Sequence, residues 1–259
     1  MLRSSIAVLF LALYILLVGP PLILHCLITR SPVEMVRLAV AGARFALVIC
    51  GIKVKVEGVG NIPPGVCIFV ANHTSNADPP AVVGAIPRRV ALLGKKEAFR
   101  VPILGTVLRL GGFVPVDRAN REAAIASVDL AIEHLKGGLS FLIFPEGTRS
   151  PDGRLRPFKK GSFVMAIRAQ VPIVPISVVG AHKVMRKGEL AGHPGSVTVK
   201  FHPPVDVTAY TMQQRDKLVA QVQAIVASGL PEDQQPLFQT TKKPDSSSRS
   251  LGTRNDDTI

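Results

Sequence analysis

Hydrophobic positions follow two different patterns along the chain. Residues 1–52 contain two long apolar stretches, whereas from residue 53 onward short apolar runs alternate with polar and amphipathic segments. Strands that alternate with helices are typical of an α/β domain whose sheet has substantial parallel content and is covered on both faces. We therefore predict a mixed, largely parallel sheet flanked by helices, preceded by a separate helical region.

The first apolar stretch is long and carries no formal charge. No Asp, Glu, Lys or Arg lies between residues 3 and 30. The Gly-Pro-Pro sequence at 19–21 should kink or break a helix and is a poor signal-peptide cleavage site. Residues 4–18 alone would span roughly 22 Å, short of the ~30 Å hydrocarbon core of a bilayer. We expect a membrane-embedded helix, which spans the bilayer if it continues through Ile28 and lies in one leaflet if it turns back.

The second apolar stretch, residues 33–52, includes two arginines on one helical face. Arg37 and Arg44 are seven positions apart, a spacing that keeps side chains aligned on a helix. Ser31 and Glu34 fit the Ser-x-x-Glu pattern of a capping box. This helix either packs on the core or lies at a membrane surface with its arginines at lipid headgroups, and we favour the second interpretation.

The same arginines bear on orientation and domain limits. If the first segment spans a bilayer, the basic residues after it place the main domain in the cytoplasm, so we expect a bacterial inner-membrane protein with a cytoplasmic catalytic domain. The predicted parts are membrane-associated helices at 1–52, an α/β domain at 53–238 and a polar tail at 239–259 that buries almost nothing and should be disordered.

The main domain contains seven runs with strand character. They are Val54–Glu57, Val66–Ala71, Val90–Leu93, Phe113–Val116, Leu139–Phe144, Ile173–Val179 and Ser196–Phe201. Pro115 favours an edge position or a strand end for its run. Asn120 can cap a helix that reaches Lys136 and stops at two glycines, and residues 212–228 have the pattern of a last helix.

Polar clusters directly follow four of these runs. They are Asn72–Asp78, Gly94–Glu97, Asp117-Arg118 and Pro145–Ser150. In open α/β sheets ligands bind beyond the carboxyl ends of the strands. We therefore expect the four clusters to form one shared site.

His73 and Asp78 are the first candidates for chemistry. An imidazole can act as a general base near neutral pH, and a carboxylate on its other ring nitrogen fixes the tautomer. Five helical residues would separate the two side chains by about 140°, so they meet only if a turn lies between them. Otherwise His73 merely caps a helix and Asp78 sits in its first turn. No Gly-x-Ser-x-Gly elbow occurs, which favours direct transfer to a hydroxyl or water over a covalent intermediate.

Composition narrows the class of partner. Lys and Arg number 31 against 18 Asp and Glu, which gives a net charge of +13, so the partner should be anionic. The chain has no Trp and only two Tyr, and with so few aromatic platforms and an apolar N-terminus we expect no nucleic-acid partner. Three scattered cysteines form neither a disulfide framework nor a zinc motif, and we expect no metal.

The basic residues near the clusters favour a phosphate ligand. Arg can engage phosphate with two hydrogen bonds, and Arg149 lies at a strand end next to Gly147, where the backbone can come close to a ligand. The alternative is a solvated basic surface that attracts anionic membrane lipid. Glu146 either binds substrate hydroxyls or pairs with Arg118 or Arg149.

Taken together, the motifs resemble the glycerolipid acyltransferase family, and within it the lysophosphatidate acyltransferases. The resemblance covers roughly residues 30–210 and rests on four motifs in family order. They are Asn72-His73 with Asp78, Gly112 to Arg118, Phe144-Pro-Glu-Gly-Thr-Arg-Ser150 and Val171-Pro-Ile-Val-Pro175. Pro115 departs slightly from the aliphatic residue that is usual in the second motif.

This resemblance implies a reaction and roles for the site residues. His73, supported by Asp78, would act as general base on the sn-2 hydroxyl of 1-acylglycerol 3-phosphate, which attacks an acyl-coenzyme A or acyl-carrier-protein thioester to give phosphatidate. The implied substrate-binding residues are Glu146, Gly147, Arg149, Arg118, Lys95 and Lys96. No cofactor is implied beyond the acyl donor. The alternatives are an acyltransferase for another lysophospholipid or for glycerol 3-phosphate, and a non-catalytic membrane protein that binds anionic lipid.

Overall fold

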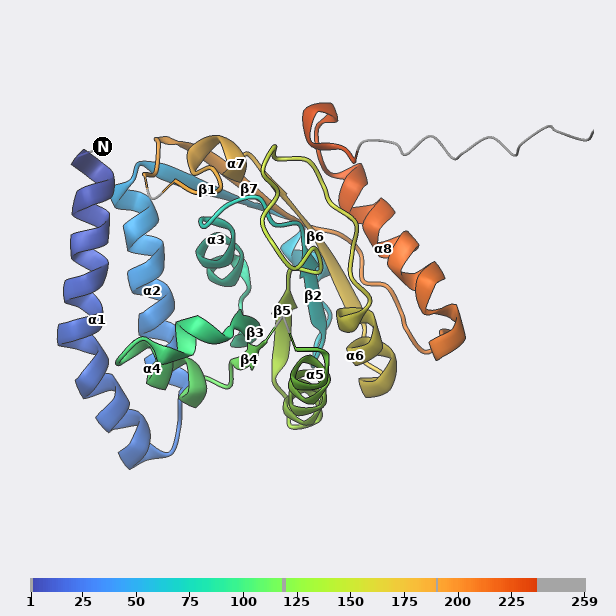
Figure 1. Ribbon diagram of the computed structural model, residues 1–259, viewed down its shortest axis with the longest axis horizontal. Coiled ribbons are helices and arrows are strands. Elements are labelled where there is room, and N and C mark those ends of the chain that lie inside the picture. Colours follow the sequence, from blue (N-terminus) through green and yellow to red (C-terminus); the bar gives the residue numbers. More distant parts are fainter. Residues whose placement is uncertain (1, 118–119, 190, 237–259) are drawn as a thin grey trace, which may run out of the picture.

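The computed structural model describes residues 2–117, 120–189 and 191–236 (Figure 1). The helices in this part of the chain are α1 (Leu2–Thr29), α2 (Val33–Ile49), α3 (Asp78–Ala85), α4 (Leu104–Leu110), α5 (Arg121–Lys136), α6 (Gly161–Ala169), α7 (Ala181–Val184) and α8 (Arg215–Ser228). Short 3₁₀ turns cover Val59–Asn61, Lys96–Arg100, Met212–Gln214 and Glu232–Gln234. The expected tail at 239–259 and Arg118 lie outside the described residues.

The described strands form one seven-stranded sheet. They are β1 (Ile52–Glu57), β2 (Ile68–Ala71), β3 (Val90–Lys95), β4 (Val114–Val116), β5 (Ser140–Ile143), β6 (Ile173–Val179) and β7 (Gly195–Phe201), in the order β1-β7-β6-β2-β5-β3-β4. All neighbouring pairs are parallel except β6 and β7. The predicted mixed, largely parallel sheet is confirmed, and β4, which contains Pro115, lies at the sheet edge as expected.

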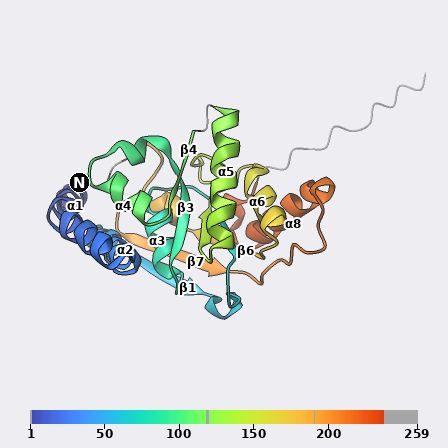
Figure 2. The same cartoon turned by 90° about the horizontal axis from the view of Figure 1, so that it is seen from below.

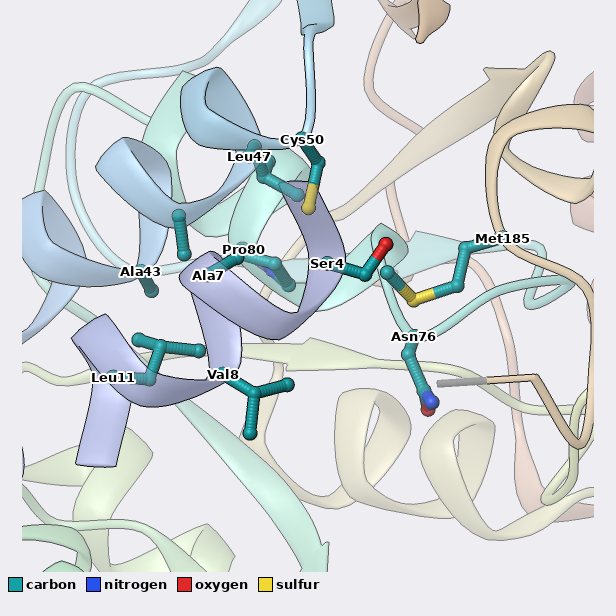
Figure 3. A pocket seen from close by; sticks show the side chains of 11 residues that line it. Ser4, Ala7, Val8, Leu11, Ala43, Leu47, Cys50, Asn76, Pro80 and Met185 are labelled. Carbon is teal, nitrogen blue, oxygen red and sulfur yellow. The ribbon is translucent and has the colours of Figure 1, made fainter. Parts of the chain in front are cut away.

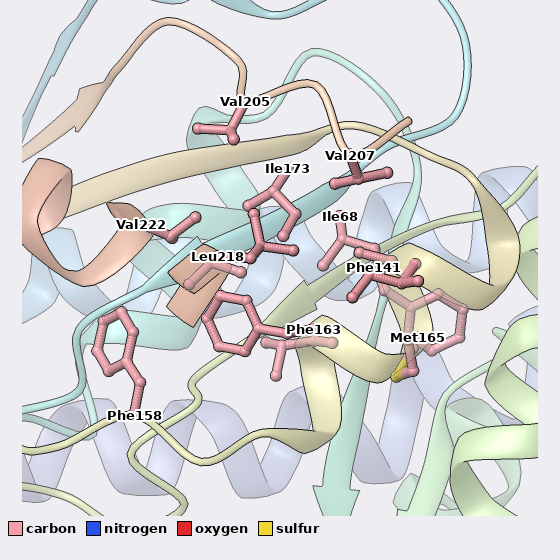
Figure 4. Close-up of a cluster of buried hydrophobic side chains, with 14 of the residues drawn as sticks. Ile68, Phe141, Phe158, Phe163, Met165, Ile173, Val205, Val207, Leu218 and Val222 are labelled. Atoms are coloured by element: carbon pink, nitrogen blue, oxygen red, sulfur yellow. The ribbon is translucent and has the colours of Figure 1, made fainter. Parts of the chain in front are cut away.

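Alternate residues of the central strands serve two separate cores, as the two-residue period of a strand requires. In β2, Ile68 and Val70 point into the core beneath α5, α6 and α8, which Figure 4 shows around Phe141 and Phe163. Phe69 faces the opposite core, beneath α2 and α3. Helices therefore cover both faces, as the two views of the molecule show (Figures 1 and 2).

Helices α1 and α2 lie side by side as an antiparallel hairpin at one end of the molecule (Figure 1). A Cβ atom on Gly42 would lie 2.5 Å from the ring of Tyr14, so only glycine allows this close approach. The Tyr14 hydroxyl donates to the carbonyl of Leu38. The outer face of α1 is apolar and exposed, and α1 is long and apolar enough to cross a membrane by length and composition.

Two expectations for this hairpin concern its helix ends. The Gly-Pro-Pro sequence, for which we expect a kink or a break, does not break α1, which runs unbroken to Thr29. Packing on α2 supports the helix on both sides of the prolines, through Tyr14 before them and Cys26 after them. The Ser31 capping box does not form either. Helix α2 begins only after Pro32, and the carboxylate of Glu34 pairs with Arg37 instead of reaching back.

Candidate active site

The sheet topology brings the four polar clusters to one edge. Strands β2, β5, β3 and β4 are adjacent in the sheet and mutually parallel. Their carboxyl ends therefore face the same side, and each end carries one of the predicted clusters. The strand order confirms that the described parts of these segments lie at one edge of the sheet; that they form one site stays a prediction.

His73 and Asp78 meet across a turn. The imidazole Nδ1 lies 2.8 Å from Asp78 Oδ2, and that same oxygen accepts the backbone N–H groups of Thr74 and Ser75 at 2.6 and 2.7 Å. Asp78 is the first residue of α3, and its side chain is fully buried. Oδ2 of Asp78 thus accepts two backbone hydrogen bonds and lies within hydrogen-bond distance of the imidazole. A carboxylate on Nδ1 fixes the proton there and leaves Nε2 as the base.

The ring of His73 is also held by Phe144, the residue directly after β5. The two rings are stacked with their centroids 4.3 Å apart and an interplanar angle of 26°. Asp78 fixes one edge of the imidazole while Phe144 covers a face, and the His73 side chain remains 17% exposed. The imidazole is therefore oriented before any substrate arrives, which is what general-base catalysis requires.

Glu146 contacts the peptide group of His73, and Arg156 is the arginine beside it. Its Oε1 accepts the backbone N–H of His73 at 2.7 Å, and no ion pair joins it to Arg149 within the described residues. Burial raises the pKa of Glu146 to about 8, and the negative charge of Asp78 acts in the same direction. The hydrogen bond from His73 and the charge of Arg156 oppose this rise. The suggested pairing with Arg149 is thus wrong, and Arg118 lies outside the described residues.

The predicted basic residues differ in their surroundings. Lys95, at the end of β3, is exposed and 3.5 Å from Glu97, whereas Lys96 pairs with Asp117. The Arg149 side chain is partly exposed, whereas its Nη1 is buried and bonds to no described residue. A Cβ on Gly147, whose φ is +72°, would lie 2.8 Å from Lys159 Nζ, so glycine allows this turn and brings a further ammonium group beside it.

Sequence reasoning missed the role of Asn72. Its side-chain amide donates to the carbonyl of Val178 at 2.9 Å and accepts the N–H of the same residue at 2.7 Å. The amide thus extends the pairing of β2 with β6 beyond the end of the strand. An Asn directly after a buried strand was the available signal, but its partner in β6 depends on the strand order.

An apolar cavity of about 190 Å³ opens beside the turn that joins His73 to Asp78. Asn76 and Pro80 line one side, and Ser4, Leu11 and Leu47 from the helical hairpin line the other (Figure 3). A second apolar cavity of about 160 Å³ lies further along the hairpin and shares Leu11 and Ala43 with the first. Within the described residues no group of three or more His, Cys, Asp or Glu side chains is placed to hold a metal ion.

The chain resembles known proteins in both sequence and structure. Residues 53–179 match the family model described as Acyltransferase. A 1-acyl-sn-glycerol-3-phosphate acyltransferase from Limnanthes douglasii is 36% identical over 195 residues, which cover 75% of this chain and 69% of that protein. The chain belongs to the acyltransferase family. The matched segment contains all four motifs, including the His73–Asp78 pair.

Relatives from bacteria extend the match. The 1-acyl-sn-glycerol-3-phosphate acyltransferase of Escherichia coli (strain K12) is 32% identical over 217 residues, 81% of this chain and 85% of that protein. The crystal structure of the 1-acyl-sn-glycerophosphate (LPA) acyltransferase PlsC from Thermotoga maritima superposes with a TM-score of 0.74 at 31% identity. That match covers 88% of this chain and 93% of the crystallised one, so the similarity reaches well beyond the motifs.

Proposed function

We propose that this protein transfers a fatty acyl group from acyl-coenzyme A or acyl-carrier protein to the sn-2 hydroxyl of 1-acylglycerol 3-phosphate, giving phosphatidate. The observation that carries the proposal is the oriented His73–Asp78 pair at the edge of the sheet, with Nδ1 and Oδ2 2.8 Å apart. Relatives that cover most of this chain carry the name of this activity.

The geometry supports a direct transfer. His73 Nε2 takes the proton of the sn-2 hydroxyl as the hydroxyl oxygen attacks the thioester carbonyl carbon. The tetrahedral intermediate collapses, the C–S bond breaks, and the leaving thiolate takes the proton back from the imidazolium. Asp78 stabilises the imidazolium between these two steps. The side chains of the described site therefore supply proton transfer and orientation, and the nucleophile is the lipid hydroxyl.

Phosphate recognition falls to the basic side chains at the same edge. Arg149 is partly exposed, Lys95 is exposed at the end of β3, and Gly147 allows close approach of the backbone. Lys96 already pairs with Asp117, so its ammonium would bind phosphate as part of a pair. We assign Arg118 to the same group on the motif alone.

The apolar regions fit a lipid substrate. The first cavity begins beside the turn after His73 and is lined mostly by carbon, which suits an acyl chain of either substrate. Helix α1 contacts the α/β domain at its start, where Ser4 bonds to Gly192, and at its midpoint, where Gly19 packs against Ile103. A helix fastened to the domain at both points favours a hairpin that lies in one leaflet over one that spans the bilayer.

Location follows from the same features. The exposed leucines of α1 would enter the lipid, while Arg37 and Arg44 on α2 are exposed to meet anionic headgroups. Because the acceptor and the product are phospholipids, we propose that the protein acts at a membrane surface, namely the cytoplasmic face of a bacterial inner membrane.

A substrate panel tests the proposed function. Purified protein in detergent micelles is given acyl-coenzyme A or acyl-carrier protein together with 1-acylglycerol 3-phosphate, other lysophospholipids or glycerol 3-phosphate. We expect phosphatidate from the first acceptor at a rate at least tenfold above the others. Equal or higher rates with another acceptor would replace the proposed substrate, and no transfer to any acceptor would leave only lipid binding.

A further inference from the structure

The backbone of the candidate base is held from both sides by the loop after β5. The N–H of His73 donates to Glu146 Oε1 at 2.7 Å, and its carbonyl accepts the backbone N–H of Ser150 at 2.8 Å. Phe144, from the same loop, stacks on the ring. One seven-residue loop therefore fixes the peptide groups and one ring face of a histidine that lies 73 positions away from Glu146 in the sequence.

Glu146 has no oxygen available to a substrate. The residue is 3% exposed, Oε1 is engaged with His73, and Oε2 has almost no accessible surface. A carboxylate that binds substrate hydroxyls must present an accessible oxygen to the substrate. Arg149, three residues further along, is only partly buried. Within this loop, Glu146 faces inward and contacts His73. Arg149 is the residue of the loop that is exposed enough to contact an anion.

Glu146 needs only to accept a hydrogen bond from the His73 N–H. Burial raises the pKa of this carboxyl to about 8, and an ionised carboxylate accepts a hydrogen bond from the His73 N–H. A neutral carboxylic acid still accepts a hydrogen bond through its carbonyl oxygen. The side-chain amide of Gln has the same shape and the same acceptor, whereas Ala has neither.

We propose that Glu146 is a positioning residue: its buried carboxyl holds the His73 peptide so that Nε2 stays aligned with the lipid hydroxyl, and it makes no contact with lysophosphatidate. Without this acceptor the His73 N–H loses its partner, and the turn that carries His73 and Asp78 is free to shift. A displacement of about 1 Å in a catalytic group can cost 10²-fold in rate. This proposal rests on the proposed function only for the expected changes in kcat and KM, which are measured in the acyl-transfer reaction.

Two variants separate positioning from substrate binding. Glu146→Ala is expected to lower kcat by about 10²-fold with a KM for lysophosphatidate within about threefold of the wild type. Glu146→Gln keeps the hydrogen-bond acceptor, so its kcat is expected to be at least tenfold higher than that of Glu146→Ala. Glu57→Gln, an exposed carboxylate on β1, is the matched control. A KM that rises while kcat is retained, or a Gln variant as slow as the Ala variant, would overturn the proposal.

A second measurement does not depend on any substrate. Amide hydrogen exchange of the peptide that contains residues 72–78, followed by mass spectrometry, reports directly on the His73 N–H. We expect faster exchange in Glu146→Ala and wild-type protection in Glu146→Gln, with the peptides of β5 and β6 unchanged. Wild-type protection in Glu146→Ala would overturn the proposal. If Glu146→Ala does not fold, Glu146→Gln decides alone: loss of His73 protection in that variant rejects the acceptor role. Failure of the substrate panel leaves this measurement valid, so the two proposals fail separately.

Discussion

The helical hairpin exposes apolar side chains to its surroundings, whereas the sheet edge buries carboxyl groups. On α1, Leu17 is 66% and Ile28 73% exposed, while the carboxyls of Asp78 and Glu146 at the sheet edge are 0% and 3% exposed. Exposed leucines are costly in water, and buried carboxyls are costly in protein unless they are hydrogen-bonded. The hairpin is therefore built for a surrounding apolar phase, and the sheet edge is built to hold one histidine in place.

The two regions meet at the turn after His73. The cavity that opens there is lined by the hairpin on one side and by Asn76 and Pro80 on the other (Figure 3). The cavity thus lies between the apolar hairpin and the turn that joins His73 to Asp78. The comparison predicts that changes at the sheet edge act on the chemical step and that changes on the hairpin act on access to lipid.

The largest expected effect at the sheet edge comes from Asp78→Asn. The amide leaves His73 Nδ1 facing a group that does not stabilise the imidazolium or fix the tautomer. We expect kcat to fall by about 10³-fold, with membrane binding unchanged. Kinetics in micelles and flotation with vesicles measure the two properties. A variant with near wild-type kcat would show that the pair is structural.

Substitutions on the hairpin should have the opposite effect to Asp78→Asn: membrane binding should fall, and kcat should not change. Replacing Leu13 and Leu17, 46% and 66% exposed, by arginine removes apolar surface that contributes about 2 kcal/mol per residue when buried in lipid. We expect vesicle partitioning to fall by about 10²-fold or more and kcat in micelles to stay near the wild type. The control is the pair Val56→Arg and Val59→Arg, two positions of the sheet domain that are each 42% exposed. Equal loss of partitioning in the control would remove the distinction between the regions.

Much of this comparison is visible in the sequence, because continuous apolar runs mark buried parallel strands. All seven predicted runs overlap a strand within two residues at each end. The order of polar clusters after these runs predicted the shared edge. His73 and Asp78 were placed together on the condition that a turn intervenes, and Thr74 and Ser75 form that turn.

What escaped prediction depends on contacts between distant segments. The bond from the His73 N–H to Glu146 requires β2 and β5 to be neighbours with Val70 opposite Ile143, and no local pattern gives that register. The unbroken α1 depends in the same way on packing against α2. Short helices such as α4 and α7 contain too few turns for a periodic pattern to stand out.

The buried carboxyl of Glu146 predicts a pH dependence of stability. Its pKa is about 8 in the folded protein against the ordinary 4.5, with Asp78, His73 and Arg156 as the groups around it. Between these values the folded state binds more protons than the unfolded state, so the free energy of unfolding falls as pH rises, by at most about 1.4 kcal/mol per pH unit. Thermal unfolding of wild type and Glu146→Gln from pH 5 to 9 measures this. We expect the Gln variant to lose less stability across this window; parallel curves would refute the buried-acid account.

The smallest effect is expected from Phe144→Leu. The substitution keeps an apolar side chain but removes the ring that stacks on His73 at 4.3 Å. A stacked pair contributes about 0.5–1.5 kcal/mol, so we expect kcat to fall about three- to tenfold. Phe113→Leu, near β4 and away from His73, is the control. An identical decrease in both variants would mean that packing in general, rather than the stack, is responsible.

The most direct test of the account compares phosphatidate formation by the wild type and by His73→Ala, using acyl-coenzyme A and lysophosphatidate in micelles. His193→Ala is the control, because this exposed histidine pairs with Glu189 in the loop before β7. The account predicts a loss of about 10²-fold or more for His73→Ala and wild-type rates for His193→Ala, with both variants folded. Equal rates for wild type and His73→Ala would contradict the assignment of His73 as the base.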